Sequence, residues 1–258
     1  MGSFGAKGSE SSTRNAHERR LGSGRSILWS IMSTAVLVLA AGRGRRLGSE
    51  IPKAFVPLSG VPLVVRSIET LLAVDGVDWV QPVLADSECA RFQALSLPPD
   101  SRLADPVPGG AERQDSVAAG LAALPVGVKY VAVHDAARCL VTVSQVETAL
   151  GVAREHRAAI LAAPVRDTVK IAKDGVVVET PDRALCWAAQ TPQVFERGLL
   201  GEALKMAELA GFRGTDDAEL VERLGVPIRI VESSWENLKI TVPGDLPLAE
   251  SILAKRNQ

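Results

Sequence analysis

Short apolar runs alternate along the chain with longer segments in which apolar residues recur at helical spacing. The apolar runs predict buried strands, and they lie at 35–41, 79–85, 130–135, 158–165 and 227–233. The amphipathic segments predict helices, and the clearest lie at 63–74, 113–124 and 144–156. Strands that alternate with helices of this length are typical of right-handed βαβ units. The pattern therefore predicts an α/β, Rossmann-like fold, with a mostly parallel sheet covered by helices on both faces.

Residues 166–190 depart from this alternation. Two short segments of alternating apolar and polar residues lie on either side of Asp174-Gly175, a dipeptide typical of a hairpin turn. We expect a β-hairpin arm that protrudes from the body. The alternative is an ordinary extension of the edge of the sheet.

The beginning of the chain allows two interpretations. Residues 1–26 are rich in Ser, Gly and Arg, and residues 27–41 are almost continuously apolar, which is the outline of a secretory signal. The other interpretation is a disordered tail at 1–32 followed by the first buried strand. Cleavage after Ala41 would remove the strand that carries the first motif below, so we favour the tail and a single domain at 33–258. A cytoplasmic protein is expected, and an organelle transit peptide stays open.

Composition narrows the class of protein. A chain of 258 residues is long enough for one large domain with a full core. A formal net charge of −1 argues against binding of nucleic acid or of an anionic membrane surface, which requires a broad basic face. No apolar run reaches the ~20 residues that a membrane-spanning helix needs. Three widely separated cysteines are expected to be reduced thiols: Cys89, Cys139 and Cys186.

The stretch LAAGRGRRLGSEIPKAF (39–55) brings glycines and cations together directly after the first predicted strand. Its cations are Arg43, Arg45, Arg46 and Lys53. The glycine spacing G-x-G-x-x-x-G is one residue longer than the dinucleotide fingerprint, and Lys53 follows a proline, unlike the lysine of a P-loop. A glycine turn with free N–H groups and nearby cations favours an anion site. The alternative is that the arginines are simply solvated.

Two further stretches could complete such a site. Gly109-Gly110 precedes Arg113 and a predicted helix, which supplies a second set of free N–H groups. Asp135 ends the strand predicted at 130–135, where open α/β sheets place their ligands. A carboxylate beside phosphates is a natural Mg²⁺ ligand, although Asp135 could instead only cap the next segment. Later in the chain come Asp216, Asp217 and Lys239.

Seven stretches, in this order, resemble the 2-C-methyl-D-erythritol 4-phosphate cytidylyltransferase family: LAAGRGRRLGSEIPKAF, PGGAERQDSV, VHDAAR, APVRDTVK, QTPQVF, TDDAELVE and ENLKITVPGDL. The resemblance runs from about Thr34 to the C-terminal end. It implies a nucleotidyltransferase fold and a reaction of CTP with methylerythritol phosphate, giving CDP-methylerythritol and pyrophosphate in isoprenoid precursor synthesis. Such a reaction depends on positioning and on charge neutralisation by cations and Mg²⁺ rather than on a nucleophilic side chain.

The resemblance also implies roles for individual residues. Arg46 and Lys53 match the cations that stabilise the α-phosphate, and Arg183 and Lys239 match those that position the substrate phosphate. The nucleotide contacts match Ala40, Ala41, Gly42, Gly110 and Ser116. The substrate contacts match Asp135, Arg138, Thr168 and Thr191, and Asp135 is also the expected metal ligand.

The family's arm matches residues 166–190 and crosses to a second subunit. The resemblance therefore implies a homodimer in which Thr168 and Arg183 serve the partner's site. Cys139 departs from the pattern, since a proline is expected after VHDAAR. Three alternatives stay open: a cytidylyltransferase for ribitol 5-phosphate or another polyol phosphate, a non-catalytic nucleotide-binding protein, and a secreted protein whose signal is removed.

Overall fold

The structure is a computed structural model that describes residues 33–42, 47–48 and 51–256. The tail predicted at 1–32 lies outside these residues, and so does Arg46. Among the described helices, none is long and apolar enough to cross a membrane.

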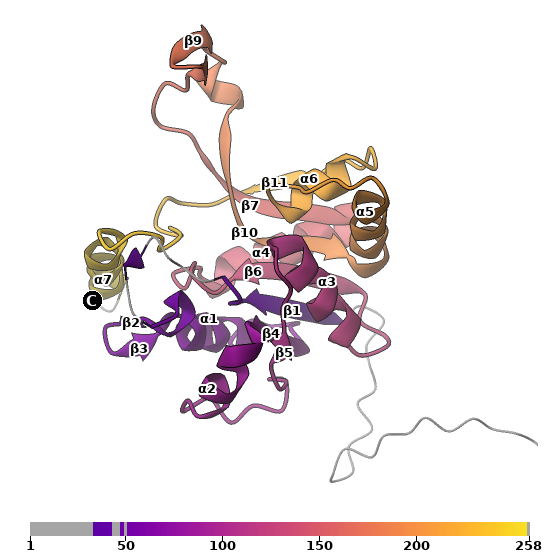
Figure 1. Cartoon of the computed structure of the whole chain (residues 1–258), viewed down its shortest axis with the longest axis vertical. Helices are drawn as coiled ribbons and strands as arrows, with labels where there is room; N and C mark the ends of the chain where they lie inside the picture. The colour runs from indigo at the N-terminus through magenta and orange to yellow at the C-terminus, as the bar shows by residue number, and fades with distance from the viewer. Residues whose placement is uncertain (1–32, 43–46, 49–50, 257–258) are drawn as a thin grey trace, which may run out of the picture.

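Within the described residues the main sheet has seven strands in the order β11-β7-β10-β6-β1-β4-β5 (Figure 1). In chain order these are β1 (Thr34–Leu39), β4 (Trp79–Leu84), β5 (Val107–Pro108), β6 (Tyr130–Asp135), β7 (Ala158–Pro164), β10 (Trp187–Glu196) and β11 (Arg229–Glu232). β10 pairs antiparallel with β6 and β7, and the other pairings in this sheet are parallel. The predicted mostly parallel α/β fold is confirmed.

The helices are α1 (Leu63–Leu72), α2 (Cys89–Gln93), α3 (Arg113–Ala123), α4 (Val143–His156), α5 (Arg197–Leu209), α6 (Asp217–Glu222) and α7 (Asp245–Arg256). Short 3₁₀ turns lie at η2 (Lys53–Phe55), η3 (Asp86–Glu88) and η4 (Arg183–Leu185). Two small ladders join β2 (Pro57–Leu58) to β3 (Val61–Pro62) and β8 (Ile171–Lys173) to β9 (Val176–Glu179).

Alternation along β1 builds a core on each face of the sheet. Val36 and Val38 belong to the cluster that holds buried residues of α1 and α4. Ala35 and Leu37 belong to the other cluster, with buried residues of α3 and α5. Because successive strand residues point to opposite faces, a continuous apolar run is what a strand covered on both sides requires.

β10 is a central strand that the sequence pattern did not predict. Its segment, WAAQTPQVFE, carries the buried polar residues Gln190, Thr191 and Gln193, which break the apolar run. Each of these side chains has a hydrogen-bond partner, so the polarity is tolerated inside the sheet. The prediction assigned Trp187 and the residues up to 190 to the arm, and the structure shows that the sheet strand already begins there.

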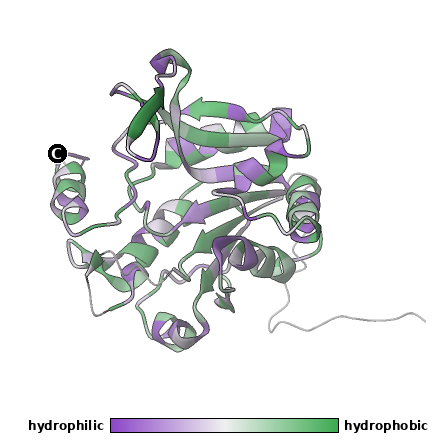
Figure 2. Ribbon diagram, turned by 45° about the horizontal axis from the view of Figure 1, so that its top comes forward, coloured by the Kyte–Doolittle hydropathy of each residue, from purple (hydrophilic) through white to green (hydrophobic). Residues whose placement is uncertain are grey.

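The hairpin prediction is confirmed. Asp174 and Gly175 both have positive φ, as a tight hairpin turn requires, and β8 and β9 form a two-stranded ladder of their own. The hairpin protrudes from the body beyond β7 and β10, which act as its base (Figure 1). Hydrophobic colour marks the buried central strands and also this protruding hairpin (Figure 2).

Candidate functional site

A cavity of about 210 Å³ lies at the carboxyl ends of β1 and β6. In these neighbouring parallel strands Leu39 lies opposite Asp135. The next strand in the chain after β1 is β4, which pairs with one side of β1, whereas the later strand β6 pairs with the other side, so the strand order reverses here. Such a switch point is where open α/β sheets bind ligands. Many of the predicted site residues line this cavity: Ala40, Ala41, Gly42, Lys53, Gly110, Ser116, Asp135 and Lys239.

One wall is the glycine turn before α3. The backbone N–H of Gly110 donates to Ser116 Oγ at 3.1 Å, and Ser116 Oγ donates to the carbonyl of Glu112 at 3.1 Å. A Cβ at Gly110 would lie 2.2 Å from Asp115 Cβ, and one at Gly109 would lie 2.7 Å from Ser116 Oγ. Glycine is therefore needed here because the turn folds tightly against the start of α3. This packing brings the N-terminus of an 11-residue helix to the cavity.

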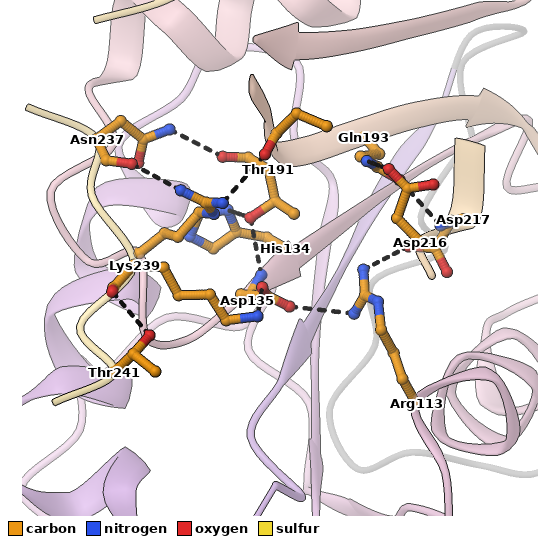
Figure 3. A network of polar contacts seen from close by, with 12 residues as sticks. Arg113, His134, Asp135, Thr191, Gln193, Asp216, Asp217, Asn237, Lys239 and Thr241 are labelled. Atoms are coloured by element: carbon orange, nitrogen blue, oxygen red, sulfur yellow. Dashed lines mark hydrogen bonds and ion pairs between the residues drawn. The ribbon is translucent and has the colours of Figure 1, made fainter. Parts of the chain in front are cut away.

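The floor is an ion-pair network around Asp135 (Figure 3). Arg113 Nη1 lies 3.1 Å from Asp135 Oδ1, and Lys239 Nζ lies 2.6 Å from Asp135 Oδ2. Burial alone would raise the pKa of Asp135, but the charges of Arg113 and Lys239 outweigh it and hold this pKa well below its usual range. Asp135 is therefore a carboxylate anion at neutral pH, and it is not only a cap of the following turn.

Two predicted substrate contacts hold the end of β6 instead of lining the cavity. The Thr191 hydroxyl accepts a hydrogen bond of 3.0 Å from the backbone N–H of Asp135 and lies 3.2 Å from Nδ1 of His134. Arg138 donates to the carbonyls of Asn237 and Ala189, at 2.9 Å and 3.2 Å. The bond from Arg138 to Asn237 fastens the segment that carries Lys239 to the turn that follows β6, and the other bonds join β10 to the end of β6 and to that turn.

His134 lies beneath this network with no exposed surface. Burial lowers its pKa to about 4, against the opposing charge of Asp135. The imidazole is therefore neutral at physiological pH, and it contributes a hydrogen-bond partner rather than a cation.

The structure does not bring every predicted residue to the cavity. Thr168 and Arg183 are exposed in the arm segment, where Arg183 Nη1 donates to the carbonyl of Arg166 at 2.9 Å. The side chain of Lys53 is half-buried at the cavity wall. Among the described residues, the predicted site cations are therefore divided: Lys53 and Lys239 line the cavity, and Arg183 lies on the arm.

The donors at the cavity fit Mg²⁺ only together with a phosphorylated ligand. Across the described residues there is no group of three or more His, Cys, Asp or Glu side chains that could hold a metal ion. Asp135 nevertheless supplies an anionic oxygen ligand of the kind Mg²⁺ prefers. Mg²⁺ is commonly held by one or two carboxylates, substrate phosphates and water, so one carboxylate is sufficient in that company.

Sequence reasoning missed two participants in the network. Arg113 was noted only for its place in the glycine turn, yet it is the side chain that joins Asp135 to Asp217, with Nη2 2.5 Å from Asp217 Oδ2. Gln193 lies within the QTPQVF stretch but was given no role, although its side chain binds both Asp216 and the start of α6. For Arg113, the available signal was the acidic pair in TDDAELVE at the start of a predicted helix, because a buried carboxylate needs a cation as its partner. A buried glutamine within a strand leaves no such signal.

Comparison with known proteins identifies the family. The model of the 2-C-methyl-D-erythritol 4-phosphate cytidylyltransferase family matches residues 34–255. A protein of that name from Symbiobacterium thermophilum is 46% identical over 220 residues, which are 85% of this chain and 92% of the relative. One from Geobacillus kaustophilus is 42% identical over 226 residues, covering 87% of this chain and 99% of the relative.

Solved structures agree with this assignment. The crystal structure of 2-C-methyl-D-erythritol 4-phosphate cytidylyltransferase from Thermus thermophilus has a TM-score of 0.71 and 32% identity, covering 86% of this chain and all of that one. A 4-diphosphocytidyl-2C-methyl-D-erythritol synthase from Anaerococcus prevotii has a TM-score of 0.79 and 25% identity, covering 87% of this chain and 97% of that one. The resemblance seen in the seven motifs is confirmed, and the chain belongs to the 2-C-methyl-D-erythritol 4-phosphate cytidylyltransferase family.

Proposed function

We propose that this chain transfers CMP from CTP to 2-C-methyl-D-erythritol 4-phosphate, giving CDP-methylerythritol and pyrophosphate. The main observation in support of this reaction is the cavity, which combines a tight glycine turn, a helix N-terminus, two lysines and an anionic carboxylate at the switch point of the sheet. Family membership supports the same reaction. A protein that only bound nucleotide would not need this concentration of cations.

In this reaction a phosphate oxygen of methylerythritol phosphate attacks the α-phosphorus of CTP. The new bond joins that oxygen to the α-phosphorus, the bond between the α-phosphorus and the bridging oxygen breaks, and pyrophosphate leaves. Two anions must approach each other, so the cost is mainly electrostatic. Lys53 would neutralise charge at the α-phosphate, together with Arg46. Lys239 would position the attacking phosphate.

The nucleotide would lie on the two glycine turns. Among the described residues, no atom lies within 4 Å of the position that a Cβ at Gly42 would take, so its backbone is open to a ligand on that side. Gly110, in the turn before α3, and the buried Ser116, in its first turns, line the same cavity, as do Ala40 and Ala41. Mg²⁺ held by Asp135 would neutralise phosphate charge when it is bound.

The arm would complete the site of a second subunit. Its hairpin exposes Ile171, Val176, Val177 and Val178, with exposed fractions of 46%, 66%, 54% and 61%. A two-stranded hairpin with apolar side chains on its surface is marginal alone and is stabilised by packing on another chain. In a homodimer formed this way, Thr168 and Arg183 would reach the partner's substrate phosphate. The cytoplasm, where free thiols persist, is the proposed location.

The test is pyrophosphate release by the purified chain with CTP and Mg²⁺, measured separately with methylerythritol phosphate and with ribitol 5-phosphate. We expect turnover with methylerythritol phosphate and little with ribitol 5-phosphate. The reverse preference would establish the polyol phosphate alternative. Release with neither substrate, from protein that still binds CTP, would establish a non-catalytic nucleotide-binding protein.

A further inference from the structure

Arg113 is held between two carboxylates that come from distant parts of the chain. One guanidinium nitrogen lies 3.1 Å from Asp135 on β6, and the other lies 2.5 Å from Asp217 at the start of α6 (Figure 3). The Arg113 side chain is 27% exposed and faces the cavity, whereas the Asp217 side chain is only 2% exposed. Asp217 therefore lies behind Arg113, away from any ligand in the cavity.

The start of α6 is fixed to the central sheet. Gln193 on β10 accepts hydrogen bonds from the backbone N–H groups of Asp217 and Ala218, at 3.1 Å and 3.0 Å, and its amide donates to Asp216 at 2.7 Å. Asp216 caps the helix by accepting from the N–H of Glu219 at 2.9 Å. The position of the Asp217 carboxylate is therefore set by a fully packed strand, and it is a rigid anchor for Arg113.

The ionised carboxylate of Asp217 reduces the stability of the folded chain because it is buried. Burial is the largest effect on Asp217, and with the neighbouring Asp135 and Asp216 it outweighs the attraction of Arg113 and raises the pKa of Asp217 to about 6. A buried carboxylate of this kind is weak support for stability. Its geometry instead serves Arg113.

We propose that Asp217 is a positioning residue for cytidylyl transfer: it fixes the guanidinium of Arg113, which in turn orients the Asp135 carboxylate at the floor of the cavity. The inference rests on the proposed function of that cavity. Without the anchor, one end of the guanidinium loses its buried partner and can turn about the remaining pair with Asp135. The carboxylate then loses its fixed orientation beside Lys239. The expected loss lies in the chemical step rather than in nucleotide binding.

Asp217→Asn is the main variant because asparagine keeps the shape and one acceptor but removes the charge. We expect kcat to fall about tenfold, as for a displacement of a group at the reacting centre, while the KM for CTP changes by less than about twofold. The thermal midpoint at pH 8 should not fall. Glu219→Gln is the matched control on the same helix: one oxygen of its carboxylate accepts from both the N–H and the hydroxyl of Thr215, and the amide oxygen of glutamine can accept both bonds. Its kinetics should stay within about twofold of wild type.

A double-mutant cycle separates positioning from a general effect. In an Arg113→Gln background, Asp217→Asn should change kcat by less than about twofold, because the residue through which it acts is gone. An equal tenfold loss in both backgrounds would overturn the proposal. So would a loss of activity in Asp217→Asn that merely parallels a loss of thermal stability.

Arg113→Lys tests the same geometry without touching α6. Lysine keeps the charge but has one nitrogen, which cannot bridge both carboxylates as the planar fork does, so kcat should again fall about tenfold. Wild-type kcat in this variant would overturn the proposal. A crystal structure of Asp217→Asn adds a readout that does not depend on the reaction: the guanidinium should have turned away from residue 217 while it stays paired with Asp135. If wild-type protein itself released no pyrophosphate while this movement was seen, the proposed function would fail and the anchoring role would stand.

Discussion

The cavity and the arm carry cations in opposite settings. At the cavity, Lys239 and Arg113 are paired with a buried carboxylate on a central strand, and the glycine turn is packed so tightly that it has no room for a side chain. On the arm, Arg183 is exposed, and the neighbouring hairpin presents apolar side chains to solvent. A preorganised site gains catalytic power because its charges need no rearrangement. In the cavity, contacts within one chain already hold the charged groups in position. We propose that the arm is held in position only when it packs on a partner subunit.

The largest effect is expected at Lys53. Lys53→Ala should reduce turnover by two or more orders of magnitude, roughly 3 kcal/mol of lost charge stabilisation at the transition state. CTP affinity, measured by calorimetry, should change much less. Lys205→Ala, an exposed lysine on α5, is the control and should behave as wild type. If turnover by Lys53→Ala fell by threefold or less, Lys53 would not have the proposed catalytic role.

The pH dependence of stability should also distinguish the buried network. With a pKa of about 6, folded Asp217 binds more protons than the unfolded chain between about pH 4 and 6, so its contribution to the free energy of unfolding falls as pH rises. His134, with a pKa of about 4, binds fewer protons when folded, so its contribution rises with pH up to about 6.5. The two contributions oppose each other in the wild type.

Asp217→Asn should leave the contribution of His134 unopposed. Between pH 4 and pH 6.5, the free energy of unfolding measured with urea in EDTA should then increase by about 2 kcal/mol more in Asp217→Asn than in wild type. The corresponding substitution on the arm, Asp174→Asn at the hairpin turn, should not change the profile. Parallel profiles for Asp217→Asn and wild type would show that the pKa of Asp217 is not raised by burial.

Alanine substitutions in the two glycine segments should have smaller effects, which differ between Gly110 and Gly42. Gly110→Ala forces its Cβ toward Asp115, so we expect a loss of about 1–3 kcal/mol in urea unfolding and weaker CTP binding. The added Cβ of Gly42→Ala meets no neighbour within 4 Å among the residues that the structure describes, so we expect the fold to be unaffected. CTP binding should still weaken in Gly42→Ala because the added methyl group would occupy the nucleotide's space. Unchanged CTP affinity in Gly42→Ala would place the nucleotide elsewhere.

The parts of the fold that the sequence predicts are those specified locally. β1 is an almost continuous apolar run, β6 begins with four mainly apolar residues, and the hairpin turn is specified by Asp174-Gly175, so each could be recognised from a few neighbouring residues. β10 could not, because its buried polar residues form hydrogen bonds to segments that are distant in sequence, such as the 44 positions between Gln190 and Ser234. Their burial becomes favourable only once those partners are in place.

The same distinction holds for the candidate site. The glycine turns and Asp135 were predicted because backbone openings and the ends of strands have recognisable patterns. The link from Arg113 to Asp217 spans 104 positions and depends on how α6 packs against the sheet. No local pattern specifies such a pair. Arg183 presents a third case, since its proposed ligand is bound by another copy of the chain.

Complementation tests the central claim, that cavity and arm of different chains form one site. Lys53→Ala and Arg183→Ala proteins should each be nearly inactive alone. When the two are co-expressed in equal amounts, half of the dimers are mixed, and each mixed dimer has one site with both lesions and one with neither. About a quarter of wild-type pyrophosphate release should therefore return, by the counting of a two-fold symmetric pair. If the co-expressed mixture stays as inactive as the separate variants, the site is built within one chain and the account is contradicted.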